Sequence, residues 1–196
     1  MTKRRFLTQE EIGRMIQAVR ASRTGERDAC LILLAFRHGF RISELLGLEF
    51  RDLDLCGGRM SVRRLKNGFS TIHPLQEDEC LALEEWIRVR DKWQRAVVPE
   101  RVFISTRGTP LSRQQAWRII RNSGEQGGIS TETHPHMLRH ACGYELAERG
   151  ADTRLIQDYL GHRNIRHTVR YTASNAARFA GIWERENRLN VNLQKK

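Results

Sequence analysis

The chain has 196 residues, and its 34 lysines and arginines against 23 aspartates and glutamates give a formal net charge of +11. This length suits one domain with a substantial core. The charge indicates a polyanionic partner, and because most of the basic residues are arginines, nucleic acid is favoured over a membrane surface. No apolar run is long enough to span a bilayer and the start lacks a signal-peptide pattern, so we expect a cytoplasmic protein.

The N-terminal part of the sequence predicts three helices. Thr8 and Glu11 form a capping box before a helix over residues 9–19, in which apolar residues recur at helical spacing. A second helix, apolar nearly all round, is expected to end at Gly39. Ser43 is expected to cap a short third helix.

Residues 59–75 predict a β-hairpin. Two short segments rich in β-branched and aromatic residues, 59–65 and 69–75, flank the dipeptide Asn67-Gly68. Both residues of that dipeptide tolerate the positive φ of a tight turn. Lys66 would therefore lie at the mouth of the turn.

Helices resume over residues 77–93, and after a short strand at 102–105 another helix begins at the Ser112 cap. Polar residues occupy one face of this helix, which we expect to contact DNA in the major groove or at its phosphates, unless it is only a solvated polar face. The residues of that face are Gln114, Arg118 and Arg121.

Two further helices are expected at 134–150, with Pro135 in the first turn, and at 152–160, with an Asp152 cap and a stop at Gly161. The predicted fold class is therefore mainly α with a small antiparallel β-sheet (α+β).

Tyr171 stands out among the three tyrosines. Tyr144 and Tyr159 fall within amphipathic helices and are expected to pack in the core. Tyr171 follows the helix stop at Gly161, in a segment that is either a basic surface loop or the carrier of a nucleophile. A phenol, with a pKa near 10, needs nearby cations or a base to become nucleophilic. The basic residues that could supply this field are His162, Arg163, Arg166, His167 and Arg170.

Other residues could bind an anion or a metal. His136 and Arg139 are three residues apart and share a helix face, whereas His140 is expected to face elsewhere. They could bind a phosphate or simply cap helix carbonyls. A metal site made of His134, His136 and His140 is less favoured, because no acidic or cysteine partner lies in register and the four cysteines show no zinc spacing.

Arg41 and Lys66 are each ambiguous when considered alone. Arg41 lies beside the free N–H groups of a helix start, where it could hold an anion or pair with Glu44. Lys66 is either a solvated hairpin residue or a proton donor to a leaving alkoxide.

The order of these residues along the chain resembles a known family. The segments HGFRISELLGL, RRLKNGFSTIHPL, HPHMLRHACGYEL and LGHRNIRHTVRYT resemble the tyrosine recombinase (phage integrase) family, whose signature is Arg, Lys, His-x-x-Arg, His and Tyr. The resemblance covers about residues 25–175 and is greatest to the small fimbrial phase-variation recombinases. The matching catalytic positions are Arg41, Lys66, His136, Arg139, His162 and Tyr171.

This resemblance implies a reaction and a role for each residue. Tyr171 would attack a DNA phosphate and form a 3′-phosphotyrosyl intermediate, without metal or ATP. Arg41 and Arg139 would hold the non-bridging oxygens, which His162 would also contact. His136 would act as general base or proton relay, and Lys66 would protonate the leaving 5′-oxygen.

The resemblance also implies an assembly and a biological outcome. It suggests one catalytic domain over residues 1–196, with no separate N-terminal DNA-clamping domain, and a homotetramer on double-stranded DNA with inverted-repeat sites. Accessory DNA-bending nucleoid proteins could assist, and the outcome would be inversion of a promoter element that controls fimbrial expression. The tail over 178–196, with the apolar residues Phe179, Ile182 and Trp183, would dock on a neighbouring subunit or on its own core.

Three alternatives stay open from the sequence. A non-catalytic DNA-binding regulator explains the charge but leaves Tyr171 and Lys66 without a role. A type IB topoisomerase-like nicking and closing enzyme shares the same site chemistry. A zinc-dependent nuclease would use the histidines.

Overall fold

A computed structural model describes residues 6–65, 69–93 and 97–173 of the chain. Its helices are α1 (Gln9–Arg20), α2 (Gly25–Arg37), α3 (Ile42–Leu46), the 3-10 helix η1 (Phe50–Asp52), α4 (Glu77–Arg90), α5 (Arg113–Gln126), α6 (Pro135–Glu148), α7 (Thr153–Leu160) and α8 (Arg166–Thr172). Its strands are β1 (Leu53–Asp54), β2 (Arg59–Val62) and β3 (Thr71–Pro74). The predicted fold class, mainly α with a small antiparallel sheet, is confirmed.

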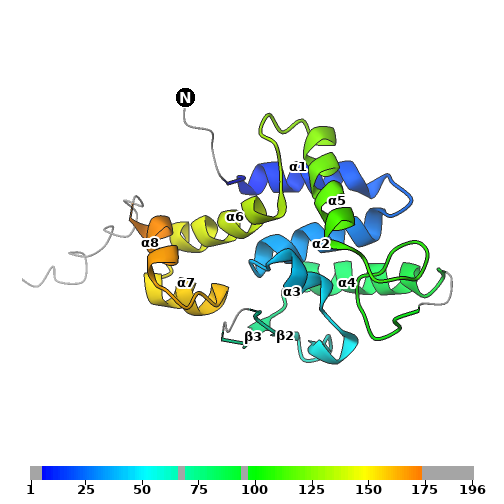
Figure 1. Cartoon of the computed structure of the whole chain (residues 1–196), viewed down its shortest axis with the longest axis horizontal. Helices are drawn as coiled ribbons and strands as arrows, with labels where there is room; N and C mark the ends of the chain where they lie inside the picture. Colours follow the sequence, from blue (N-terminus) through cyan, green and yellow to red (C-terminus); the bar gives the residue numbers. More distant parts are fainter. Residues whose placement is uncertain (1–5, 66–68, 94–96, 174–196) are drawn as a thin grey trace, which may run out of the picture.

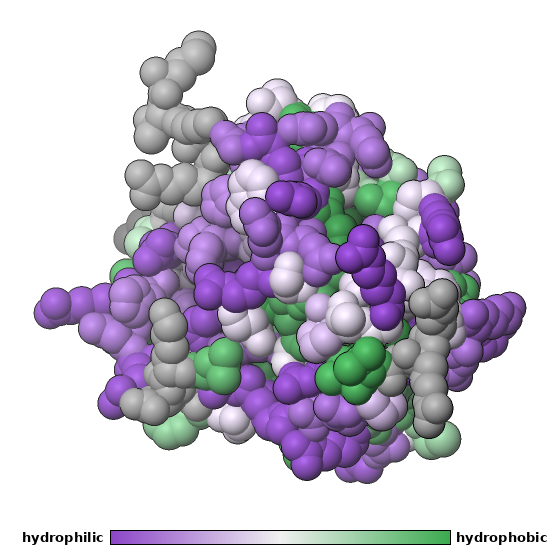
Figure 2. All heavy atoms as spheres, turned by 45° about the vertical axis from the view of Figure 1, so that its right-hand side comes forward, coloured by the Kyte–Doolittle hydropathy of each residue, from purple (hydrophilic) through white to green (hydrophobic). Residues whose placement is uncertain are grey.

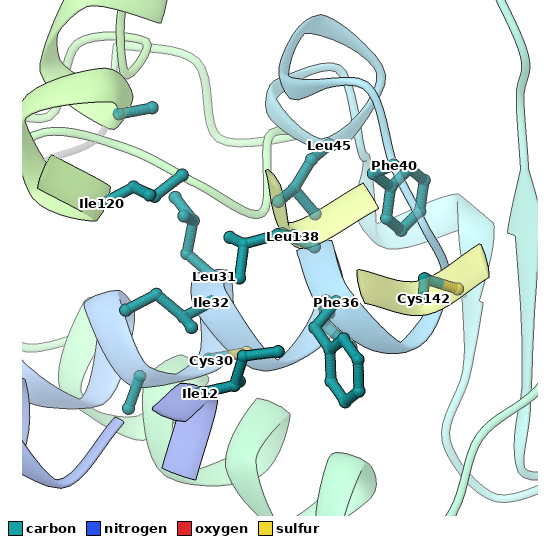
Figure 3. Packing of buried hydrophobic residues seen from close by; sticks show 14 of the residues in the cluster. Ile12, Cys30, Leu31, Ile32, Phe36, Phe40, Leu45, Ile120, Leu138 and Cys142 are labelled. Atoms are coloured by element: carbon teal, nitrogen blue, oxygen red, sulfur yellow. The ribbon is translucent and has the colours of Figure 1, made fainter. Parts of the chain in front are cut away.

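Helix α2 lies at the centre, where it packs against α1, α4 and α6 (Figure 1). Its residues are apolar nearly all round because neighbouring helices cover it on several sides. Leu31, Ile32 and Leu34 are completely buried. Figure 3 shows Leu31 and Ile32 among core side chains from other helices, including Ile12 of α1 and Ile120 of α5.

The small sheet has the strand order β1-β2-β3, and both pairs are antiparallel. In the β2–β3 pair Met60 lies opposite His73 and Val62 opposite Thr71. Side chains alternate between the faces of a strand, so Met60 and Val62 point inward and are completely buried. The predicted hairpin is thus present, while its turn residues Asn67 and Gly68 lie outside the described part of the chain.

Local capping signals predict most helix starts correctly. Thr8 accepts from the Glu11 amide at 3.2 Å while the Glu11 carboxylate accepts from the Thr8 amide at 2.9 Å. Ser112 caps α5 in the same reciprocal way, and Asp152 caps α7. Gly161 ends α7 with φ +64°, as its position after the apolar run predicts.

Two local predictions are wrong. Arg41, not Ser43, is the N-cap of α3, because Glu44 turns back to accept a hydrogen bond from the Arg41 amide at 2.9 Å. No regular strand forms over 102–105; there Ile104 only makes an isolated bridge with Pro110. Of the two interpretations left open for the segment that carries Tyr171, the simple surface loop is excluded, because Tyr171 lies in helix α8.

The face of the molecule shown in Figure 2 is predominantly hydrophilic, with small groups of exposed apolar residues between the hydrophilic ones. Among the described helices, none combines the length and apolar character needed to cross a bilayer. The tail residues Phe179, Ile182 and Trp183 lie outside the described residues.

Candidate active site

Two buried arginines meet at the backbone carbonyl of Gly39, in the turn after α2. Arg139 of α6 donates from Nη1 to this carbonyl and from Nη2 to the Leu160 carbonyl at 2.7 Å. Arg64, which follows β2, donates from Nη1 to the Gly39 carbonyl at 3.4 Å and from Nη2 to the Tyr159 carbonyl at 2.5 Å. These bonds join the end of α2 to the end of α7.

Gly39 is required at this point for two reasons. Its φ of +56° is strained for residues with a side chain. An added Cβ would also lie 2.3 Å from Leu160 Cδ2 and 3.2 Å from Cys142 Sγ. The turn can therefore approach α6 and α7 closely enough to be held by both arginines.

The Glu44 carboxylate sets the position of Arg41. Its Oε1 accepts from Arg41 Nη1 at 2.6 Å, and its Oε2 accepts from Arg64 Nη1 at 3.0 Å. Burial alone would raise the pKa of Glu44, but hydrogen bonds from Arg41 and Leu65 and the charge of Arg64 together lower it. Glu44 is therefore an anion that holds Arg41 while 26% of the Arg41 side chain stays exposed.

Arg41 opens onto a cavity of about 580 Å³, the Arg41 cavity. Its walls come from the start of α3, the first turns of α5 and the N-terminal end of α6. The residues that line it are Phe40, Arg41, Ile42, Ser43, Leu65, Arg113, Gln114, Trp117, His134, Pro135 and His136. Two predicted catalytic residues, Arg41 and His136, thus share one cavity.

His162 is buried directly after the αL turn at Gly161. Its backbone amide donates to the Gln157 carbonyl at 2.9 Å, and its Nδ1 lies 2.9 Å from Thr168 Oγ1. Burial first, and then the positive charges of Arg139 and Arg41, lower the pKa of His162 to about 3. The imidazole is therefore neutral at pH 7, and the field around it is positive.

Tyr171 is 1% exposed and lies against α6. Its Oη is 2.9 Å from His140 Nδ1, and its ring is tilted by 18° from the His162 ring, with centroids 6.4 Å apart. Tyr144 packs edge-on against it, with centroids 5.1 Å apart. Burial raises the pKa of Tyr171, while the charges of Arg139 and Arg170 lower it to a smaller extent.

Five of the six predicted catalytic residues lie in one region, and Lys66 lies outside the described residues. The charges of Arg41 and Arg139 reach His162, which stacks on Tyr171. The prediction that His140 faces away from the site is wrong, because α8 packs against α6 and brings Tyr171 onto it.

Arg64 and Glu44 were not identified from the sequence as site residues. Strand alternation could have identified Arg64, because it continues the inward positions of Met60 and Val62. An arginine at an inward position needs buried partners. The capping position of Glu44, three residues after Arg41, is the corresponding signal for the carboxylate.

The polar face of α5 is only partly available to a ligand. Gln114 and Arg118 are exposed, and Gln114 lines the Arg41 cavity. Arg121 is engaged by two carboxylates, Glu125 at 2.6 Å and Glu132. Near Tyr171, the exposed basic residues are Arg163, Arg166, His167 and Arg170.

The histidines do not form a metal site. Within the ranges described, no group of three or more His, Cys, Asp or Glu side chains is arranged to hold a metal ion. The four cysteines are free, with Cys30 and Cys142 buried and Cys56 exposed.

Comparisons with known proteins agree with this geometry. The model of the phage integrase family matches residues 5–178. Over 195 residues the chain is 67% identical to the type 1 fimbriae regulatory protein FimE of Escherichia coli K12, covering all of this chain and 98% of FimE. It is 55% identical over 183 residues to FimB of the same strain, covering 93% of this chain and 91% of FimB.

Solved recombinase structures share the fold. XerA recombinase superposes with a TM-score of 0.76 at 26% identity, over 95% of this chain and 66% of that chain. XerH bound to a palindromic difH substrate after cleavage superposes with a TM-score of 0.74 at 25% identity, over 91% of this chain and 53% of that chain. The chain belongs to the phage integrase family, as a site-specific tyrosine recombinase.

Proposed function

We propose that the chain cleaves and rejoins double-stranded DNA at inverted-repeat sites and thereby inverts a promoter element that controls fimbrial expression. The similarity to FimE and FimB supports the fimbrial setting, and the XerH complex with palindromic DNA supports the symmetry of the sites. The observation that carries the chemistry is the position of Tyr171 beside His162 and within the field of Arg139, while Arg41, whose charge also reaches His162, lines a cavity.

In this mechanism Tyr171 Oη attacks a backbone phosphorus and the 5′-oxygen leaves, giving a 3′-phosphotyrosyl ester. Arg41 and Arg139 bind the non-bridging oxygens as negative charge builds up on them. Burial first, and then the charges of Arg64 and Arg41, lower the pKa of Arg139 to about 10. A phosphate anion would relieve this mutual repulsion, so the site favours the negative group it has to stabilise.

The remaining roles follow the same electrostatics. His162 donates a hydrogen bond to the phosphate oxygens, and Lys66 protonates the 5′-oxygen. His136, on the wall of the Arg41 cavity, contacts the scissile phosphate or relays protons. The ester conserves the energy of the broken bond, so religation to another 5′-hydroxyl needs no ATP.

DNA contacts outside the reacting phosphate come from two basic surfaces. Gln114 and Arg118 of α5 contact the major groove or phosphates. Arg121 contributes less to DNA binding, because carboxylates already pair with it. Beside Tyr171 the phosphates are contacted by Arg163, Arg166 and Arg170, which are all exposed.

The reaction runs in a homotetramer on DNA in the bacterial nucleoid, with strands exchanged in pairs. Accessory DNA-bending proteins bring the two sites together. The tail over 178–196, which lies outside the described residues, would dock on a neighbouring subunit or on its own core.

Trapping of the covalent adduct tests this proposal. On a nicked duplex that carries an inverted repeat, the wild-type protein should accumulate a covalent adduct at Tyr171, and Tyr171→Phe should bind the DNA without forming it. Tyr144→Phe is the matched control, because Tyr144 touches the same ring but stays clear of the hydroxyl contact. Covalent adducts formed by Tyr171→Phe would show that Tyr171 is not the nucleophile.

Two other outcomes would replace the proposal. Relaxation of supercoiled plasmids of any sequence would indicate a topoisomerase-like enzyme. Specific binding without any adduct in the wild-type protein would indicate a DNA-binding regulator.

A further inference from the structure

His140 holds the hydroxyl of the nucleophile, although it is outside the signature of the family. Its Nδ1 lies 2.9 Å from Tyr171 Oη, at hydrogen-bonding distance. Tyr171 is almost completely buried and does not line the Arg41 cavity. His140 is thus in direct contact with the atom that has to lose a proton before it can form a bond to phosphorus.

Three residues of α6, here called the Tyr171 cradle, keep this contact in place: His140, Gly143 and Tyr144. A Cβ at Gly143 would lie 2.6 Å from both Cε2 and Cζ of Tyr171, so the ring fits only because Gly143 has no side chain. Tyr144 packs edge-on against the ring. The phenol therefore lies flat on the helix, with its oxygen directed at His140.

His136 occupies a different environment. It is exposed and lines the Arg41 cavity at the first turn of α6, whereas Tyr171 lies farther along the helix, against Gly143. A general base has to reach the proton it removes, directly or through one water molecule. The 2.9 Å contact of His140 with Tyr171 Oη meets this requirement for the phenolic proton.

The protonation state of His140 suits an acceptor. Burial first, and then the charges of Arg170, His136, Arg139 and His134, lower the pKa of His140 to about 4. The ring is neutral at pH 7, and with its proton on Nε2 it presents a lone pair from Nδ1 to the Tyr171 hydroxyl. DNA would strengthen this base, because a phosphate beside Arg139 and Arg170 offsets the charges that lower its pKa.

We infer that His140 is the general base for Tyr171 in both directions of the reaction, an inference that rests on the proposed function. In cleavage, the Tyr171 Oη–H proton passes to His140 Nδ1 while the Oη–P bond forms, the P–O5′ bond breaks and Lys66 protonates the 5′-oxygen. In rejoining, the incoming 5′-hydroxyl gives its proton to the Lys66 amine and attacks phosphorus, the Oη–P bond breaks, and the imidazolium returns its proton to Oη. His136 then acts on the phosphate from the wall of the Arg41 cavity.

Substitution of His140 in the full chain tests this assignment. His140→Asn places an amide near the position of Nδ1, so it can keep a hydrogen bond to Tyr171 but cannot accept the proton. We expect single-turnover cleavage of the nicked duplex to fall by about 100-fold to 10,000-fold. DNA affinity and the urea midpoint should stay close to those of the wild-type protein, as they should in the control Asp158→Asn, which changes a half-exposed residue of α7 outside the site.

Two chemical substitutions separate a base from a positioning residue. A fluorinated tyrosine at position 171 that ionises near neutral pH should restore much of the His140→Asn rate, because it needs no base. A 5′-bridging sulfur in the DNA, which leaves without protonation, should not restore it. If the sulfur substrate restored the rate, His140 would act on the leaving 5′-oxygen and not on Tyr171, and the inference would be overturned.

The remaining outcomes are equally decisive. A wild-type rate in His140→Asn would overturn the base assignment. A rate loss in His140→Ala that is absent in His140→Asn would also overturn it, because His140 would then only position Tyr171. Absence of any adduct with the wild-type protein would instead defeat the proposed function. An adduct in the wild-type protein and in Asp158→Asn, with slow cleavage in His140→Asn, supports the inference.

Discussion

Loss of the Glu44 carboxylate should markedly lower the free energy of unfolding, because this buried charge pairs with a buried arginine. It is completely buried and pairs with Arg64, whose side chain is also completely buried, at 3.0 Å. In Glu44→Gln one oxygen is replaced by an NH2 group, which would face either Arg41 Nη1 and the Leu65 amide or Arg64 Nη1 and the Arg41 amide. Donors would then face donors.

The size of the effect follows from the burial of the pair. Removal of one partner of a buried ion pair costs about 3–5 kcal/mol. Arg64 keeps its bonds to the carbonyls of His38 and Tyr159, and the second cation, Arg41, is partly exposed, so we expect the lower end of that range. For a chain of this length, each kcal/mol lowers the melting temperature by about 2–4 °C.

Urea unfolding at pH 7 measures this loss. Glu44→Gln should lower the midpoint without changing the slope, because the surface exposed on unfolding stays the same. The matched control is Asp158→Asn, which breaks an exposed pair with Arg154 and should change stability by no more than about 0.5 kcal/mol. A loss below about 1 kcal/mol in Glu44→Gln would refute the treatment of Glu44 and Arg64 as a desolvated pair.

Three further predictions follow from the structure. Gly143→Ala puts a Cβ 2.6 Å from the ring of Tyr171, so adduct formation should fall at least about tenfold while stability drops by about 1–3 kcal/mol; an unchanged rate would contradict the cradle. Burial first, and then the charges of His38 and Arg64, lower the pKa of His73 to about 3, so unfolding free energy should fall as pH drops from about 6.5 towards 3, less steeply in His73→Gln. Arg118→Ala should reduce the salt slope of DNA binding by about 0.9, measured by fluorescence anisotropy, and the carboxylate-paired Arg121 should matter less; equal slopes for the two variants would disprove this ranking.

Features encoded by neighbouring residues could be predicted from the sequence. The cap of α1 depends on Thr8 and Glu11, three residues apart, and the end of α7 depends on Gly161 alone. Such signals act through hydrogen bonds and backbone conformations within one turn, so they are readable without the rest of the fold. The catalytic residues could be assigned to one site only through the family resemblance, because each of them was ambiguous when considered alone.

Features set by distant residues could not be predicted. Ser43 carries a good capping signal, but Glu44, which is held by Arg64, bonds to the Arg41 amide and begins the helix two residues earlier. The direction of His140 depends on where α8 packs against α6, and the sequence of α6 contains no information about α8. Tertiary contacts overrode the local pattern at α3 and gave the unassigned His140 a partner.

The arginines of the site divide between holding the fold and facing the ligand, and the geometry indicates which does which. Arg64 is completely buried and bonds to carbonyls and to Glu44, so it serves the fold. Arg41 has one Nη on Glu44 and an exposed remainder at the cavity, so it can bind a phosphate without breaking any contact. Arg139 uses one N–H of each Nη on the Gly39 and Leu160 carbonyls, which leaves Nε–H and one N–H on each Nη as donors. Arg139 therefore has donors for a phosphate without giving up either carbonyl, so it can hold the turn at Gly39 and bind the ligand at the same time.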